Sequence, residues 1–243
     1  MKFEGALSTK AILLAKKRVV DVIYIDEEKK DRNTDFILQQ AQKQGVVIKR
    51  VPRHEIDELC DGKTHGGIVS FAQERKYQSL DSILKQKGEH FICVLEGIED
   101  PFNLGYALRT LYSAGCQGVI LRERDWSFAE GAIVKSSAGA SEYLAWVSSS
   151  DIAKDIQKCK AKGCKAIAAM RQNAVDYYDV DYTGSFVLAI GGEMRGLSRS
   201  VLSGIEQNIV IPYANDFKNA LNASSAVAAL SFEVVRQRRK GVK

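Results

Sequence analysis

The sequence predicts an α/β protein whose C-terminal part is a mostly parallel sheet with helices on both faces. A smaller N-terminal α/β domain precedes it. Short β-branched runs alternate with helical patterns along the 243 residues, as in strand–helix units. At least six such units follow residue 91, and their strands are continuous apolar runs typical of strands buried on both faces. A polar stretch at residues 76–90 reads as a linker between residues 1–75 and residues 91–243.

The first 75 residues predict a compact domain of alternating helices and strands. Ser8 is a candidate cap for the first helix, and either Asn33 or Thr34 opens a second helix that Gly45 stops. The remaining predicted elements are strands at 19–25, 46–51 and 67–72 and a short helix at 53–59.

A glycine-flanked loop precedes the third of these strands. Its residues Lys63, Thr64 and His65 are followed by Gly66 and Gly67, which have no side chain to keep a phosphate backbone away. The same composition is typical of a plain turn, and a plain turn is the favoured interpretation.

The second domain begins with an apolar strand at 91–95, a polar break at Asp100-Pro101 and a helical pattern. Asn103 stands where a helix N-cap is expected. Arg109 follows six residues later, nearly two turns on, which predicts that it returns roughly to the side of Asn103. The later predicted elements are strands at 119–121, 144–147, 164–170, 186–190 and 209–211 and helices at 128–138, 151–162 and 220–239.

Composition excludes several classes of protein. No apolar run approaches the roughly 20 residues of a membrane helix, and the first five residues lack the apolar core of a signal peptide. The five cysteines are scattered without a CxxC pair, and only three histidines are present, so no metal-ligand set can be assembled by spacing. We therefore expect a reduced, cytoplasmic protein without a metal.

The charge is unevenly distributed. Residues 1–80 carry 15 basic and 12 acidic side chains, and the last eight residues carry five cations without an acid. Basic ends around a mildly acidic middle suit a polyanion that binds through the ends. A solvated C-terminal helix end, where cations favour the helix dipole, explains the tail equally well.

Polar stretches follow three of the predicted strands, at residues 99–109, 191–197 and 211–224. Ligands of parallel sheets bind outside the carboxyl ends of the strands. The Gly191-Gly192 pair lacks the spacing of a dinucleotide or Walker loop, and all three histidines lie at or before residue 90, which excludes a Ser-His-Asp set. The remaining polar side chains at the strand ends provide no ready nucleophile, and they suit a reaction in which a substrate oxygen attacks a bound electrophile: Asn103, Arg109, Glu193, Asn222 and Ser224.

Three ordered motifs carry a resemblance to a known family. They are DPFNLG with Arg109-Thr110, then GGEMRGL at 191–197, then Ile211-Pro212 with Leu221-Asn222-Ala223-Ser224. Residues 91–239 thereby resemble the SpoU (TrmH-type) RNA ribose 2′-O-methyltransferases of the SPOUT superfamily. Residues 1–75 are similar, more weakly, to the family's ribosomal-protein-L30e-like RNA-binding extension. The resemblance implies a trefoil knot, S-adenosyl-L-methionine as cofactor, a homodimer with its active site at the subunit interface, and methylation of a ribose in RNA.

The resemblance also implies roles for individual residues. Arg109 matches the family's proposed catalytic arginine, which the substrate's phosphate is thought to activate; the alternative is a guanidinium fork that holds that phosphate. Asn103, Glu193 and Asn222 match the other catalytic positions, where the first two would orient Arg109, the ribose or the partner subunit. The expected cofactor-binding residues are Gly191, Ile211, Leu221 and Ser224.

This chain departs from the family pattern in its third motif. Ala220 replaces the usual serine, Tyr213 replaces the usual methionine, and the loop after Pro212 is about one residue longer. The two-domain layout and the end of the chain resemble the branch that acts on ribosomal RNA, with transfer RNA as the second candidate. The departures motivate an alternative: an RNA-binding or ribosome-assembly protein that kept the fold and lost most of its turnover.

Overall fold

The computed structural model describes residues 1–60, 62–192 and 194–240, which form two compact units. Unit 1 comprises Met1–Lys76 and Asp125–Tyr143, and unit 2 comprises Tyr77–Arg124 and Leu144–Lys243. The predicted division placed all of residues 91–243 in the second domain, whereas residues 125–143 pack within unit 1.

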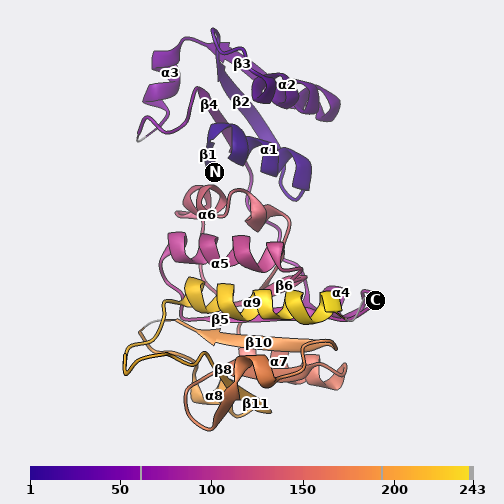
Figure 1. Ribbon diagram of the computed structural model, residues 1–243. Helices are drawn as coiled ribbons and strands as arrows, with labels where there is room; N and C mark the ends of the chain where they lie inside the picture. Colours follow the sequence, from indigo (N-terminus) through magenta and orange to yellow (C-terminus); the bar gives the residue numbers. More distant parts are fainter. Residues whose placement is uncertain (61, 193, 241–243) are drawn as a thin grey trace. The chain divides into compact units, whose positions relative to one another are not determined.

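Unit 1 is built on a four-stranded sheet of order β1-β4-β2-β3 (Figure 1). Only the β2–β3 pair is parallel. Buried aliphatic side chains of the sheet and of α1 and α2, among them Ile23, Ile25 and Ile37, form its core. Its elements are β1 (Lys2–Glu4), α1 (Gly5–Ala15), β2 (Val20–Asp26), α2 (Arg32–Gln44), β3 (Val47–Val51), α3 (Arg53–Glu58), β4 (Ile68–Ala72), α6 (Glu130–Ser136) and a 3₁₀ turn (Ala140–Glu142).

Both helix starts predicted in this unit were wrong. The short strand β1, which was not predicted, runs directly into α1, so the helix begins at Gly5 and Ser8 is buried inside it. Helix α2 is capped by Asp31, whose carboxylate accepts a hydrogen bond from the Thr34 N–H at 2.8 Å. An aspartate is as good a cap as the asparagine two residues later, and the pattern alone did not separate them.

Four buried charged side chains connect the two segments of unit 1. This buried quartet consists of Arg18, Arg75, Glu130 and Glu142, each less than 10% exposed. Arg18 and Arg75 each pair with both glutamates, and the Arg75–Glu142 and Arg18–Glu142 contacts measure 2.6 and 2.8 Å. Two cations and two carboxylates neutralise one another, which is the condition under which charges tolerate burial.

Unit 2 is a seven-stranded sheet of order β7-β6-β5-β10-β8-β11-β9 in which every neighbouring pair is parallel. The predicted α/β class and mostly parallel sheet are confirmed. Its strands are β5 (Phe91–Glu96), β6 (Gly118–Arg122), β7 (Ala145–Ser149), β8 (Lys165–Ala169), β9 (Ala174–Asp176), β10 (Phe186–Gly191) and β11 (Gln207–Val210). Its helices are α4 (Leu80–Leu84), α5 (Pro101–Ser113), α7 (Ile152–Ala161), α8 (Arg199–Leu202) and α9 (Ala223–Lys240), with a 3₁₀ turn at Tyr177–Asp179.

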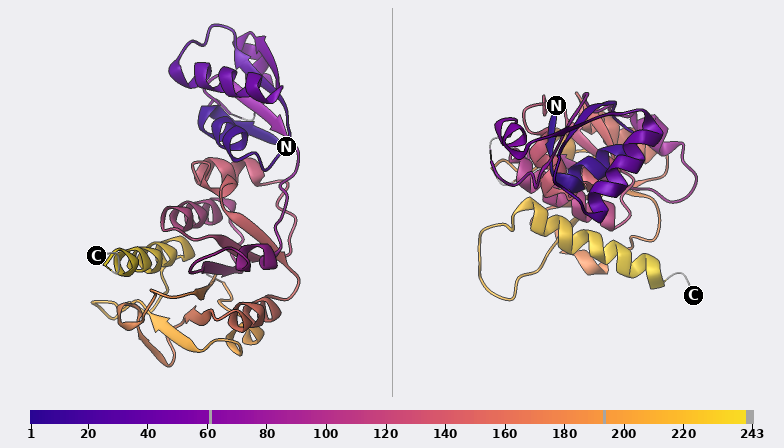
Figure 2. Two further views of the ribbon diagram at one scale, coloured as in Figure 1. Left: turned by 90° about the vertical axis from the view of Figure 1, so that its right-hand side faces the viewer. Right: turned by 90° about the horizontal axis from the view of Figure 1, so that it is seen from above.

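Helices cover both faces of this sheet. Helices α5 and α9 lie side by side on one face, as Figures 1 and 2 show. On the other face, α4, α7 and α8 bury a continuous core against alternate residues of the strands, including Ile92, Val94 and Val187. Strands buried on both faces explain the unbroken apolar runs in the sequence.

The stretch predicted as a linker contains part of this core. Leu80, Ile83 and Leu84 of α4 are buried against the sheet, so residues 80–84 belong structurally to unit 2. The helix is short, and the residues around it in the sequence are polar. The pattern of the stretch therefore predicted a linker, although three of its apolar residues are buried. Within the described ranges, no helix is long and apolar enough to cross a bilayer.

Candidate functional site

The loops at the carboxyl edge of the unit 2 sheet meet where the strand order reverses. From β5 the chain continues outward to β6 and β7, whereas β10 borders β5 on its other side and leads toward β8 and β11. Open parallel sheets bind ligands at such a switch point. The loops after β5, β10 and β11 therefore frame the candidate site, as the three polar stretches predicted.

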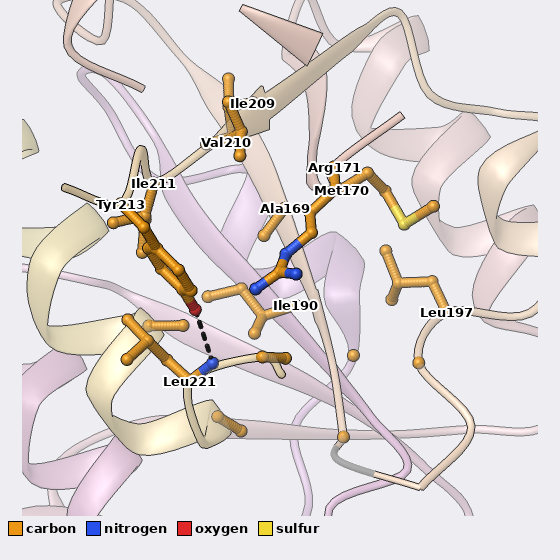
Figure 3. A pocket seen from close by; sticks show the side chains of 16 residues that line it. Ala169, Met170, Arg171, Ile190, Leu197, Ile209, Val210, Ile211, Tyr213 and Leu221 are labelled. Carbon is orange, nitrogen blue, oxygen red and sulfur yellow. Dashed lines mark hydrogen bonds between the residues drawn. The ribbon is translucent and has the colours of Figure 1, made fainter. Parts of the chain in front are cut away.

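A cavity of about 270 Å³, the main pocket, lies at this edge (Figure 3). It is lined by the ends of β8, β10 and β11, by the loop at 196–197 and by the chain entering α9. Gly191, Ile211 and Leu221, three of the predicted cofactor-binding residues, line it. Its lining combines apolar side chains with glycine backbone, which is the usual makeup of a pocket for an organic ligand.

A smaller cavity of about 190 Å³, the side pocket, adjoins the main pocket. Gly192 and Ala223 line both cavities. Asp100 and Asn103, from the loop after β5 and the start of α5, contribute its polar side chains. Two adjacent cavities at one sheet edge can place two reactants next to each other.

Glycines allow the strand-end loops to touch backbone to backbone. The Gly192 N–H donates to the Glu96 carbonyl at 2.6 Å. A β-carbon on Gly192 would lie 1.9 Å from the Gly97 carbonyl oxygen, and one on Gly191 would lie 2.5 Å from the Gly196 carbonyl carbon. No larger residue fits either position without moving backbone.

The cap of α5 is Asp100 and not Asn103. The Asp100 carboxylate accepts from the Asn103 N–H at 2.7 Å, and Pro101 occupies the first turn, where its missing N–H costs nothing. Asn103 consequently lies inside the helix, half-buried and facing the side pocket.

Arg109 lies on α5 away from both cavities. It is exposed, and among the described residues it is not one that lines either pocket. Six residues turn a helix by about 600°, which is 120° short of two turns, so Arg109 and Asn103 do not share a face. Arg109 instead lies on one exposed stripe with Phe102, Tyr106 and Ser113.

Two of the remaining predicted residues, Asn222 and Ser224, lie at the start of α9 and line neither cavity. The Asn222 carboxamide oxygen accepts from the Ser225 N–H at 2.8 Å and from the Ser224 hydroxyl at 3.1 Å, which caps α9. Asn222 is exposed. Glu193 lies outside the described residues.

Two residues that organise the site were not predicted. The buried Glu96 carboxylate accepts from the Ser198 N–H and pairs with Arg122, both at 2.8 Å, and so connects the end of β5 to the chain after β10. Arg171, after β8, holds the loop before α9 through two carbonyl groups. A charged residue ending an otherwise apolar strand was the available signal for Glu96.

Comparison with known proteins identifies both parts of the chain. The SpoU rRNA Methylase family model matches residues 90–232, and a second model, RNA 2′-O ribose methyltransferase substrate binding, matches residues 4–78. A Staphylococcus aureus protein assigned to the TrmH family of tRNA/rRNA methyltransferases is 32% identical over 223 residues, covering 90% of this chain and 89% of that protein.

Solved structures share the fold. The AdoMet-bound rRNA methyltransferase from Sinorhizobium meliloti superposes with a TM-score of 0.79 at 24% identity, covering 97% of this chain and 87% of that one. The TrmH/SpoU tRNA modifying enzyme of A. aeolicus superposes with a TM-score of 0.58 at 21% identity, covering 67% of this chain and 82% of the other.

Proposed function

Because the chain belongs to the SpoU rRNA Methylase family, we propose that it transfers a methyl group from S-adenosyl-L-methionine to the 2′-oxygen of a ribose in RNA. The observation that carries the proposal is the pair of adjacent cavities, with shared lining residues, at the switch point of the unit 2 sheet. One cavity would hold the cofactor, and the other would open toward the ribose.

The residues of the main pocket fit this cofactor. Gly191 and Gly192 leave room for close backbone approach, and apolar side chains such as Ile190 and Leu197 suit an adenine ring. Gly191, Ile211 and Leu221 would contact the cofactor, and Ser224 would support the start of α9 through Asn222. When bound, the sulfonium supplies an electrophilic methyl group.

The chain's own residues would position the attacking oxygen. Arg109 would act through its guanidinium cation, which would grip a phosphate next to the target ribose. Asn103 would orient the ribose from the side pocket, and Glu193 and Asn222 would complete the polar surroundings. Positioning of this kind replaces a protein nucleophile.

The position of Arg109 supports a homodimer with a shared site. Phe102 and Tyr106, which flank Arg109 on the same stripe of α5, are 52% and 49% exposed, and Phe232 of the adjacent α9 is 53% exposed. Exposed aromatic residues around one arginine are typical of an interface core. A second copy that covers this stripe would carry its own Arg109 toward its partner's pocket. Sedimentation velocity measures whether the dimer forms.

We also infer a trefoil knot in unit 2, as the family resemblance implies. The close backbone contact between the loops after β5 and β10 is compatible with a threaded chain. Knots are exceptions among folds, so this inference depends on the family alone.

Ribosomal RNA is the favoured substrate and transfer RNA the second candidate. The two-unit layout is shared over 97% of this chain with an rRNA methyltransferase, whereas the tRNA modifying enzyme covers 67%. A cytoplasmic location accords with either RNA. Mapping ribose methylation in RNA from cells with and without the gene tests the choice; a site that disappears from transfer RNA alone would contradict it.

A second candidate function is RNA binding without turnover. Ala220, which lines the main pocket, and the altered loop favour it. Titration calorimetry with S-adenosyl-L-methionine separates the two. If the protein does not bind S-adenosyl-L-methionine but binds RNA with an affinity that falls steeply with salt, the RNA-binding function is supported.

Replacing Gly192 with alanine is expected to abolish cofactor binding. Its β-carbon would collide with the Gly97 carbonyl oxygen, so the two loops would separate and both cavities would change shape. Calorimetry measures the loss. Gly184→Ala, at a position with open space around the new β-carbon, is the matched control and should bind like wild type.

A further inference from the structure

Arg171 is the centre of a set of contacts that fix the loop before α9. Its guanidinium donates hydrogen bonds to the carbonyl oxygens of Lys218 and Asn219 at 2.5 and 2.6 Å. Its central carbon lies 4.9 Å from the centroid of the Tyr213 ring, within the range of a cation–π contact. One side chain therefore contacts the loop near its start, at Tyr213, and near its end, at residues 218–219.

Tyr213, near the start of the same loop, contacts residues near its end. Its hydroxyl accepts a hydrogen bond from the Leu221 N–H at 2.9 Å, across eight residues of chain. Its ring lies 6.3 Å from that of Phe217. In Figure 3 the Tyr213 side chain extends along the pocket toward Leu221. Both Tyr213 and Leu221 line the main pocket, so this hydrogen bond sets the shape of one wall.

The loop needs such contacts because little else orders it. Residues 211–222 have no helix or strand, and nearly all of residues 212–222 are exposed. Fixing each residue of a free segment costs conformational entropy. A loop that is already ordered binds its ligand without that cost at the moment of binding.

These contacts fall on the positions at which the sequence resemblance predicts a departure from the family pattern. The loop is longer, Ala220 lacks a hydroxyl, and Tyr213 supplies a hydroxyl from the opposite side of the loop. Lysine could not replace Arg171, because the planar fork reaches two adjacent carbonyls while its face lies on an aromatic ring.

We propose that Arg171 and Tyr213 are positioning residues that hold the lengthened 212–222 loop in its cofactor-binding shape. The inference rests on the proposed function, since it assigns a role within the same pocket. It makes the altered third motif a compensated variant of the site, in which Arg171, from the segment after β8, and Tyr213, from within the loop, hold the loop's geometry.

The test compares Arg171→Ala, Arg171→Lys and Tyr213→Phe with Arg199→Ala, an exposed arginine on α8 that serves as the matched control. Calorimetry with S-adenosyl-L-homocysteine gives the dissociation constant, and steady-state assays give kcat and the KM values for cofactor and RNA. Thermal unfolding shows whether each variant keeps its fold.

Arg171→Ala is expected to weaken binding by about tenfold or more, because two hydrogen bonds from a charged donor are lost. Arg171→Lys should not restore binding. Tyr213→Phe removes one neutral hydrogen bond and should weaken binding by about two- to tenfold. The KM for cofactor rises in these variants, while kcat at saturating cofactor, the KM for RNA and the melting temperature stay within twofold or a few degrees of the control.

Cofactor affinity of Arg171→Ala and Tyr213→Phe equal to that of Arg199→Ala would overturn the inference. So would full rescue by lysine, or an equal loss of kcat with no change in the KM for cofactor. If the wild-type protein itself fails to bind the cofactor, the proposed function fails instead, so the two failures are distinguishable.

Discussion

Replacing Arg109 with alanine is expected to lower the rate of methyl transfer by about 10²-fold or more, the usual consequence of removing a preorganised charged or polar group from a reaction centre. The cause would be loss of the cation that holds the phosphate next to the target ribose. Single-turnover assays with saturating cofactor and RNA measure the chemical step directly. Arg109→Lys should recover only part of the rate, because an ammonium cannot bind a phosphate through two parallel hydrogen bonds.

Several controls separate this loss from unfolding. Arg109 is exposed on α5, so its removal should leave the melting temperature unchanged, and the dimer should persist because the aromatic residues Phe102, Tyr106 and Phe232 remain. Lys154→Ala removes an exposed cation from α7, far along the chain from the site loops, and should transfer methyl groups at the wild-type rate. Full activity of Arg109→Ala would contradict the mechanism.

Replacing Glu142 with glutamine is expected to destabilise the fold of unit 1 by about 3–5 kcal/mol, the usual cost of breaking a buried ion pair by removing one partner. Glu142 pairs with Arg18 at 2.8 Å and with Arg75 at 2.6 Å, and all three side chains are at most 2% exposed. The neutral amide would leave two buried guanidinium groups with only Glu130 to balance them. Urea denaturation gives the change in the free energy of unfolding.

The pH dependence provides an independent check on the buried quartet. Burial alone would raise the pKa of Glu142, but Arg75 and Arg18 outweigh it and hold the pKa below its ordinary value of 4.5. A lowered folded-state pKa means that the stabilisation is complete above the unfolded-state value and is lost as the pH falls through the folded-state value. Wild-type stability should therefore decline below about pH 4.5, and Glu142→Gln should lack this component.

Arg53→Ala is the matched control in the same unit, because the Arg53 side chain is 47% exposed and its pair with Asp26 measures 3.3 Å. Exposed pairs contribute about 0–1 kcal/mol. A stability loss no larger in Glu142→Gln than in Arg53→Ala would show that the quartet is not a stabilising element.

The sequence was sufficient to predict the parallel sheet and the edge of the sheet at which three polar loops meet. Apolar strands followed by polar loops indicated where the loops after β5, β10 and β11 would meet, and Gly191, Ile211 and Leu221 indeed line one pocket. The sheet was predictable because burial on both faces leaves a strong local pattern, and the polar loops at the strand ends mark where ligands of such sheets bind.

What the sequence did not show depends on contacts between distant residues. The pairing of Arg18 and Arg75 with Glu130 and Glu142 joins positions more than 50 residues apart, and no local pattern marks it. The Arg171 contacts span 47 and 48 residues. The cap of α5 was misassigned because Asp100 and Asn103 are both good caps, and only the backbone decides between them.

The most direct test of the central claim is methyl transfer by the purified protein. RNA extracted from cells that lack the gene is incubated with S-adenosyl-L-methionine carrying a labelled methyl group, digested to nucleosides and analysed by mass spectrometry. The account predicts a labelled 2′-O-methylnucleoside that is absent from the reaction with Arg109→Ala. Label on a base, or no label in RNA despite a bound cofactor, would contradict it.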